Sequence, residues 1–179
     1  MFGTNSSLID FKKTTSKNIE DFFLFVDRCK SEKLPQGQSK EYAILAFFEA
    51  STRTRLSFEA ACARVGIVPM IFDGGINTSL EKGETVEDSL YNMAAMAPTL
   101  MIIRCGQSVD LARFVNKFSF PILNAGWGVN SHPSQTLLDL YTLRKHWKKF
   151  SDKKLLIVGD VKHSRVVASH REIAQTLGI

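Results

Sequence analysis

The sequence lacks the features that mark disulfide-bonded, metal-binding and membrane-spanning proteins. It contains only three cysteines, which neither pair in sequence nor have the spacing of metal ligands: Cys29, Cys62 and Cys105. No apolar run approaches the length that crosses a bilayer, and residues 1–4 show no charged or apolar region of a signal peptide. We therefore expect a cytoplasmic protein with reduced cysteines, no metal site and no membrane association.

Several common ligand-binding motifs are also missing. There is no Walker-type loop, and no Ser-His-Asp elbow is visible. The segment Gly126-Trp127-Gly128 has neither the third glycine nor the downstream acid of a dinucleotide fingerprint. These absences disfavour the alternative of an α/β nucleotide-binding domain, which would bind a mononucleotide.

The positive charge is modest and dispersed. Lysine and arginine number 23 against 18 acidic residues, for a formal net charge of +5. The one dense basic run, residues 144–149, falls where a helix should end, and cations there complement the helix dipole. We expect small anionic substrates and no nucleic acid.

Helical and apolar segments alternate regularly along the chain. The expected helices cover residues 18–30, 56–65, a segment that a Thr85 capping box opens, 109–117 and 136–147. The expected strands cover residues 42–48, 67–72, 99–104, 121–124 and 155–158, and a polar loop covers 73–83. This alternation predicts an α/β fold: a parallel sheet with helices on both faces, with ligands at the carboxyl ends of the strands.

Ser51, Thr52, Arg53 and Thr54 stand where the first strand runs into a helix. A helix N-terminus offers unpaired N–H groups and a partial positive charge, to which these residues add three hydroxyls and a guanidinium. The alternative is an ordinary Ser/Thr helix cap beside surface arginines. A cap needs only one hydroxyl, so this run of donors favours a phosphate-binding cradle.

Three further polar residues are expected at the same edge of the sheet. Arg104 ends an apolar strand and is either a solvated strand end or an anion ligand. His132 precedes Pro133, which biases the histidine away from helical dihedral angles and aims it back at the strand ends. His132 and Gln135 together can hydrogen-bond a carbonyl or an amide, although a lone histidine is more often structural.

Four segments together resemble the transcarbamoylases over nearly the whole chain: residues 51–59, Arg104, residues 132–139 and residues 159–165. Residues 77–85 are similar to the aspartate branch of that family. Ornithine enzymes typically carry a cysteine where this chain has Ser134, which also favours the aspartate branch; the ornithine type is the alternative. The resemblance implies transfer of a carbamoyl group from carbamoyl phosphate to the amine of L-aspartate, in pyrimidine biosynthesis.

The resemblance also implies roles for individual residues. Ser51, Thr52, Arg53 and Thr54 would hold the phosphate, while Thr54, Arg104 and His132 would contact the carbonyl oxygen as catalytic groups, and Gln135 would receive the carbamoyl amide. Arg165 would pair with an aspartate carboxylate. Ser79 and Lys82 would reach the site of a neighbouring subunit, where Lys82 contacts both substrates. This implies a homotrimer with shared active sites and needs neither metal nor organic cofactor.

The chain departs from the family pattern in sequence and in length. Cys105-Gly106 follows the arginine where His-Pro or a similar pair is usual, and Trp127 replaces an acid in the glycine-rich turn. We expect residues 1–148 to form a carbamoyl-phosphate-binding domain that includes the connecting helix. Residues 149–179 would be the first βα unit of a truncated aspartate-binding domain.

Truncation would affect both activity and packing. The chain alone would then be a carbamoyl-phosphate-binding fragment without appreciable transfer activity. The apolar side chains of residues 154–179 would be exposed, so this segment would be mobile, swapped or packed against another chain. The resemblance leaves open whether regulatory chains or a dihydroorotase partner bind.

Overall fold

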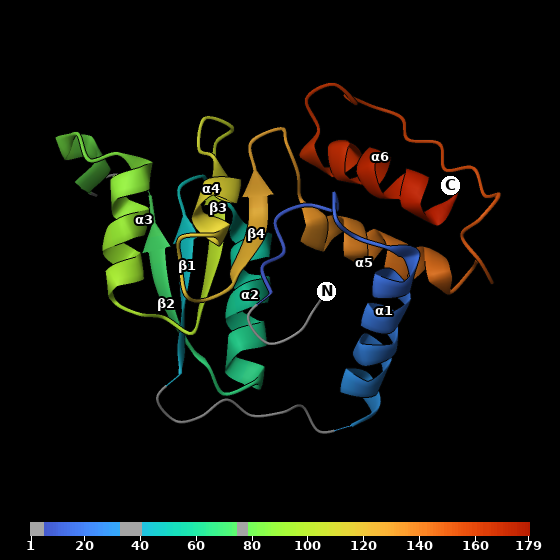
Figure 1. Cartoon of the computed structure of the whole chain (residues 1–179), viewed down its shortest axis with the longest axis horizontal. Helices are drawn as coiled ribbons and strands as arrows, with labels where there is room; N and C mark the ends of the chain where they lie inside the picture. The colour runs from blue at the N-terminus through green and yellow to red at the C-terminus, as the bar shows by residue number, and fades with distance from the viewer. Residues whose placement is uncertain (1–5, 33–40, 75–78) are drawn as a thin grey trace.

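The computed structural model describes residues 6–32, 41–74 and 79–179. Figure 1 shows a sheet flanked by helices, with α5 and α6 side by side at the end of the molecule beyond β4. In chain order the elements are α1 (Ser16–Ser31), β1 (Tyr42–Phe47), α2 (Thr52–Arg64), β2 (Val68–Asp73), the 3-10 helix η1 (Ser79–Lys82), α3 (Val86–Ala95), β3 (Leu100–Cys105), α4 (Leu111–Val115), β4 (Ile122–Trp127), α5 (Pro133–Arg144) and α6 (Arg165–Leu177).

The four strands form one parallel sheet in the order β2-β1-β3-β4. This confirms the predicted α/β class. The register pairs Phe47, at the carboxyl end of β1, with Asp73 of β2 and Arg104 of β3. The polar residues that follow these strands therefore lie at one edge of the sheet, as parallel pairing requires.

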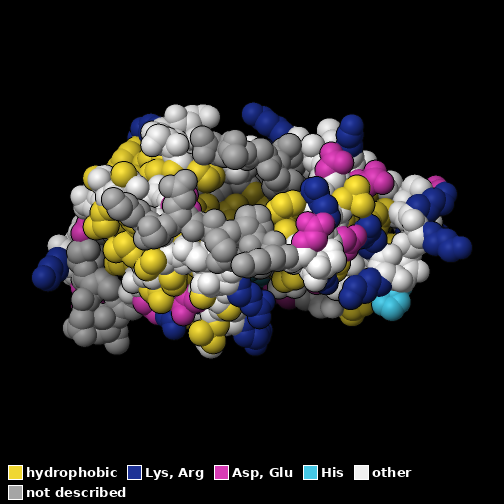
Figure 2. All heavy atoms as spheres, turned by 90° about the horizontal axis from the view of Figure 1, so that it is seen from below, with side chains coloured by type: hydrophobic (Ala, Val, Ile, Leu, Met, Phe, Trp, Pro, Cys, Tyr) yellow, Lys and Arg dark blue, Asp and Glu magenta, His cyan; other side chains and the backbone are white. Residues whose placement is uncertain are grey.

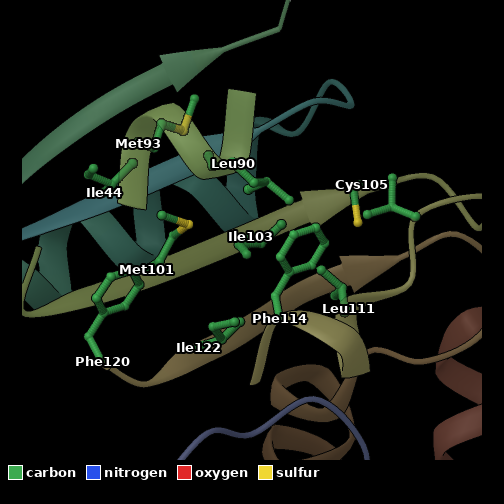
Figure 3. Close-up of a cluster of buried hydrophobic side chains, with 12 residues drawn as sticks. Ile44, Leu90, Met93, Met101, Ile103, Cys105, Leu111, Phe114, Phe120 and Ile122 are labelled. Atoms are coloured by element: carbon green, nitrogen blue, oxygen red, sulfur yellow. The ribbon is translucent and has the colours of Figure 1, made fainter. Parts of the chain in front are cut away.

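Alternate residues of the central strands supply the cores on the two faces of the sheet. On one face, Ile44 and Ile103 pack with α3 and α4, where Leu90, Leu111 and Phe114 are fully buried (Figure 3). On the other face, a second set packs against α2: Ala43, Leu45, Phe47, Cys62, Ile102 and Ala125. Burial on both faces explains why β1 and β3 are almost continuously apolar.

A third apolar cluster joins α6 to the N-terminal half of the chain. Its buried members come from the segment before α1, from α1, from α5 and from α6: Leu8, Phe11, Ile19, Phe23, Leu137, Leu140, Ile173 and Leu177. Hydrogen bonds reinforce it, since the Phe11 N–H donates to Glu172 Oε2 at 2.6 Å and Ser16 Oγ donates to the Thr176 carbonyl at 2.5 Å. The helix α6 is therefore packed within this chain, so the prediction that the apolar side chain of Leu177 would be exposed is wrong, while the mobility of residues 154–179 stays a prediction.

The strand predicted at residues 155–158 does not form. A strand needs a neighbour to pair its backbone groups, and none of the described residues lies alongside as a partner. Leu156 and Val158 are each 86% exposed, so the apolar run is irregular chain at the surface. The predicted βα unit is thus present only as its helix, and the proposed domain boundary at residue 148 stays a prediction.

Among the described residues, no helix is both long enough and apolar enough to cross a membrane.

Candidate functional site

A groove of about 1630 Å³ opens at the carboxyl ends of the strands and extends along α1 and α5. Eight of the residues predicted from the sequence line it: Ser51, Thr52, Arg53, Thr54, Arg104, His132, Gln135 and Arg165. They come from the start of α2, the end of β3, the start of α5 and the start of α6. The fold therefore brings together residues that lie as much as 114 positions apart, from Ser51 to Arg165.

The start of α2 is built to receive an anion. Ser51 occupies the N-cap position with extended dihedral angles (φ −160°, ψ 107°), yet its side chain makes no capping hydrogen bond. Its hydroxyl therefore remains free for a ligand, which weakens the reading of this residue as a simple cap. The first turn contains no acidic side chain, and Thr52 and Arg53 are exposed. The N–H groups of this turn have no intrahelical acceptor and add to the site.

Two guanidinium groups face the groove and share one carboxylate. Arg165 Nη1 donates to Glu49 Oε2 at 2.9 Å, and Arg104 Nε lies 3.9 Å from the same oxygen. Arg104 is anchored by its Nη1, which donates to the Ala125 carbonyl at 3.3 Å. Burial, with a smaller contribution from Arg165, lowers the pKa of Arg104. Two cations against one carboxylate leave net positive charge, which favours an incoming anion.

Gly126 allows the side chains of Arg104 and Arg165 to lie close to the backbone at the end of β4. Its φ of +128° lies in a region that other residues rarely adopt. A Cβ at this position would stand 2.9 Å from Arg104 Nη1 and 3.3 Å from Arg165 Nη1. Any larger residue here would displace both guanidinium groups.

His132 is held as a neutral ring beside these arginines. Its side chain is in the groove wall, and the residue is only 7% exposed. Burial, followed by the charges of Arg165 and Arg104, lowers its pKa to about 4. Its backbone N–H donates to Ser169 Oγ at 2.8 Å, and its Nδ1 lies 3.3 Å from Ser134 Oγ. A neutral imidazole can donate one hydrogen bond, for example to a carbonyl oxygen.

Of Ser79 and Lys82, the structure describes only the side chain of Lys82, which lies outside the groove of its own chain. Both belong to η1, and Lys82 is exposed to solvent. Residues 75–78, which carry part of the predicted polar loop and of the motif at 77–85, lie outside the described residues.

Sequence reasoning missed four residues that shape the site: Glu49, Gly126, Asp139 and Ser169. Glu49 could have been found, since it follows β1 at the same sheet edge as Arg104. Asp139 and Ser169 carry no such signal, because their roles depend on contacts of α5 with its own next turn and with α6.

Comparison with known proteins places the chain in a family. Residues 6–145 match the family described as aspartate/ornithine carbamoyltransferase, carbamoyl-P binding domain. The chain therefore belongs to the aspartate/ornithine carbamoyltransferase family.

Two curated relatives are aspartate carbamoyltransferase catalytic subunits. The protein from Nitratiruptor sp. is 39% identical over 96% of this chain and 59% of its own length. The protein from Aliarcobacter butzleri is 44% identical over 76% of this chain and 46% of its own length. The chain thus spans about half the length of these relatives.

Solved structures agree on the fold. Aspartate transcarbamoylase from Trypanosoma cruzi, in complex with aspartate and phosphate, superimposes with a TM-score of 0.82 at 26% identity, over 97% of this chain and 56% of that one. Ornithine carbamoyltransferase from Thermus thermophilus gives a TM-score of 0.80 at 23% identity, over 96% of this chain and 58% of that one. The second likeness concerns the fold alone.

Proposed function

We propose that this chain binds carbamoyl phosphate in the groove and supplies most of a site that transfers the carbamoyl group to the amine of L-aspartate. The products would be N-carbamoyl-L-aspartate and phosphate, in the cytoplasmic synthesis of pyrimidines. The observation that carries the proposal is the convergence of an anion-binding helix start with two arginines and a neutral histidine in one groove. The relatives are aspartate carbamoyltransferase catalytic subunits, which supports the aspartate branch.

The geometry suits each stage of this transfer. The start of α2 and Arg53 would balance the charge of the departing phosphate. Attack by the amine places negative charge on the carbonyl oxygen, where Thr54, Arg104 and His132 would donate. Preorganised donors of this kind are commonly worth about 3 kcal/mol each.

Arg165 is suited to a carboxylate of aspartate. Its side chain is 21% exposed and already holds a carboxylate, that of Glu49, at 2.9 Å. An incoming aspartate carboxylate would share this guanidinium or take it over from Glu49. Ser134, at the position where ornithine enzymes typically carry cysteine, is consistent with the aspartate type.

An Arg53→Ala substitution is expected to weaken the binding of carbamoyl phosphate and of inorganic phosphate at least about 10-fold, because a charge-assisted hydrogen bond is lost. Isothermal titration calorimetry of the 179-residue chain measures this directly. Arg171→Ala is the matched control, since Arg171 is an exposed arginine of α6 that does not line the groove. Equal affinities for wild type and Arg53→Ala, with both folded, would remove the cradle from the proposal.

We further propose that the complete site is shared between chains of a homotrimer. Lys82 is exposed and lies away from its own groove, so it is free to serve a neighbour. The edge strand β2 and the start of α2 expose apolar side chains that contact between chains would cover: Leu56, Val68, Met70 and Ile71. On the face in Figure 2, hydrophobic side chains gather mainly over the half of the molecule that carries the sheet.

Complementation between inactive chains tests the shared site. In chains of the relatives' full length, Lys82→Ala and His132→Ala should each abolish most activity. Mixed trimers should regain part of it, because some sites then receive neither substitution. Mass spectrometry would verify that hybrids form, and hybrids without recovered activity would contradict the shared site.

A further inference from the structure

Asp139 connects the proposed substrate ligand Gln135 to α6. It lies one turn beyond Gln135 on α5, and its Oδ1 accepts a hydrogen bond from Gln135 Nε2 at 3.1 Å. Its other oxygen, Oδ2, lies 3.4 Å from Nε2 of His170 on α6. One carboxylate therefore bridges a groove residue and a buried histidine of another helix.

His170 is itself held firmly. Its side chain is 9% exposed, and its Nδ1 lies 2.8 Å from the Val166 carbonyl oxygen and 3.3 Å from Thr136 Oγ1. Thr136 is completely buried. The ring therefore has little freedom to turn, and it keeps its Nε2 beside the carboxylate of Asp139.

The polarity of the contact between Asp139 and Gln135 is unambiguous. An ionised carboxylate can only accept hydrogen bonds, so the glutamine must turn its NH₂ group toward it. The carbonyl oxygen Oε1 is then directed away from Asp139, and none of the described residues donates to it. Because Gln135 lines the groove, this oxygen is an acceptor available to a ligand there.

We propose that Asp139, anchored by His170, is a positioning residue that makes the site selective for a carbamoyl group. By holding Gln135 in this orientation it provides an acceptor for the N–H of a carbamoyl NH₂ group. An acyl phosphate with a methyl group at that place has no such donor and would leave the acceptor unpaired, which costs affinity. This inference rests on the proposed function, since it concerns the same groove.

Selectivity is the property to measure, because a purely structural role of Asp139 would not change it. Two stable phosphonates make a matched pair of probes: phosphonoacetamide carries the NH₂ group, and 2-oxopropylphosphonate carries a methyl group in its place. Inorganic phosphate reports the cradle alone. Calorimetric affinities of the 179-residue chain for the three probes give the preference for the amide and the strength of the cradle separately.

Asp139→Asn is expected to reduce the preference for phosphonoacetamide over 2-oxopropylphosphonate at least about five-fold. The asparagine can donate as well as accept, so Gln135 is no longer held in one orientation. Loss of the negative charge should affect both phosphonates alike and so cancel in the ratio. Asp152→Asn is the control: Asp152 is an exposed carboxylate, paired with Lys149, that does not line the groove.

Two further variants establish that Asp139 acts through Gln135. His170→Leu should lower the preference by a smaller factor, since it removes only the anchor. Gln135→Leu should abolish the preference, and adding Asp139→Asn to it should change nothing more. An unchanged preference in a folded Asp139→Asn chain would overturn the inference.

The wild-type chain separates this inference from the proposed function. Binding of phosphate without discrimination between the two phosphonates would overturn the role of Asp139 and leave the cradle intact. Absence of any phosphate binding would overturn both.

Discussion

Replacing Ile173 by alanine is expected to lower the free energy of unfolding of the whole chain by about 3 kcal/mol. Ile173 of α6 is 1% exposed and packs in the cluster that α1, α5 and the segment before α1 complete. Shortening the Ile173 side chain would leave a cavity between elements that lie on both sides of residue 148 in the sequence. If these elements unfold together, the substitution lowers the free energy of unfolding of all of them.

Urea denaturation followed by circular dichroism and by tryptophan fluorescence measures this effect. Both probes should shift together to lower urea in Ile173→Ala. Leu156→Ala, at a position that is 86% exposed, is the control and should leave the midpoint unchanged. Separate transitions, with only one moved by Ile173→Ala, would instead establish residues 149–179 as an independent unit.

The sheet and the phosphate cradle were predictable because their signals are local. A buried parallel strand needs an apolar run, and a helix start with several donors needs only consecutive residues, as at Ser51–Thr54. The same logic placed Arg104 and His132 at the carboxyl edge, since parallel pairing puts all strand ends together.

The remaining features of the site depend on contacts between segments far apart in the sequence. Glu49 and Arg165 are separated by 116 positions, and no sequence pattern predicts their ion pair. The packing of α6 was likewise not predictable, because an apolar helix face does not indicate which elements it will pack against. The missing strand at residues 155–158 shows the converse: an apolar run predicts strand propensity, but pairing requires a neighbour.

His132 should make the stability of the chain depend on pH. Its pKa is about 4 in the folded chain, against an ordinary value of 6.5. Above pH 6.5 the ring is neutral in both states and carries no penalty. As the pH falls toward 4, the unfolded chain takes up a proton that the folded chain refuses, so the free energy of unfolding declines. Between pH 7 and pH 5 the expected loss is about 2 kcal/mol.

A His132→Gln chain isolates this contribution, because glutamine keeps a polar side chain at the site and does not titrate. The other three histidines, His146, His163 and His170, are present in both chains and cancel in the comparison. Urea denaturation at pH 7 and at pH 5 should show wild type losing about 2 kcal/mol more than the variant. Equal losses in the two chains would mean that His132 accepts a proton in the folded state as readily as in the unfolded one. The ring would then be charged near pH 5, and neither its burial nor the two neighbouring arginines would be holding it neutral.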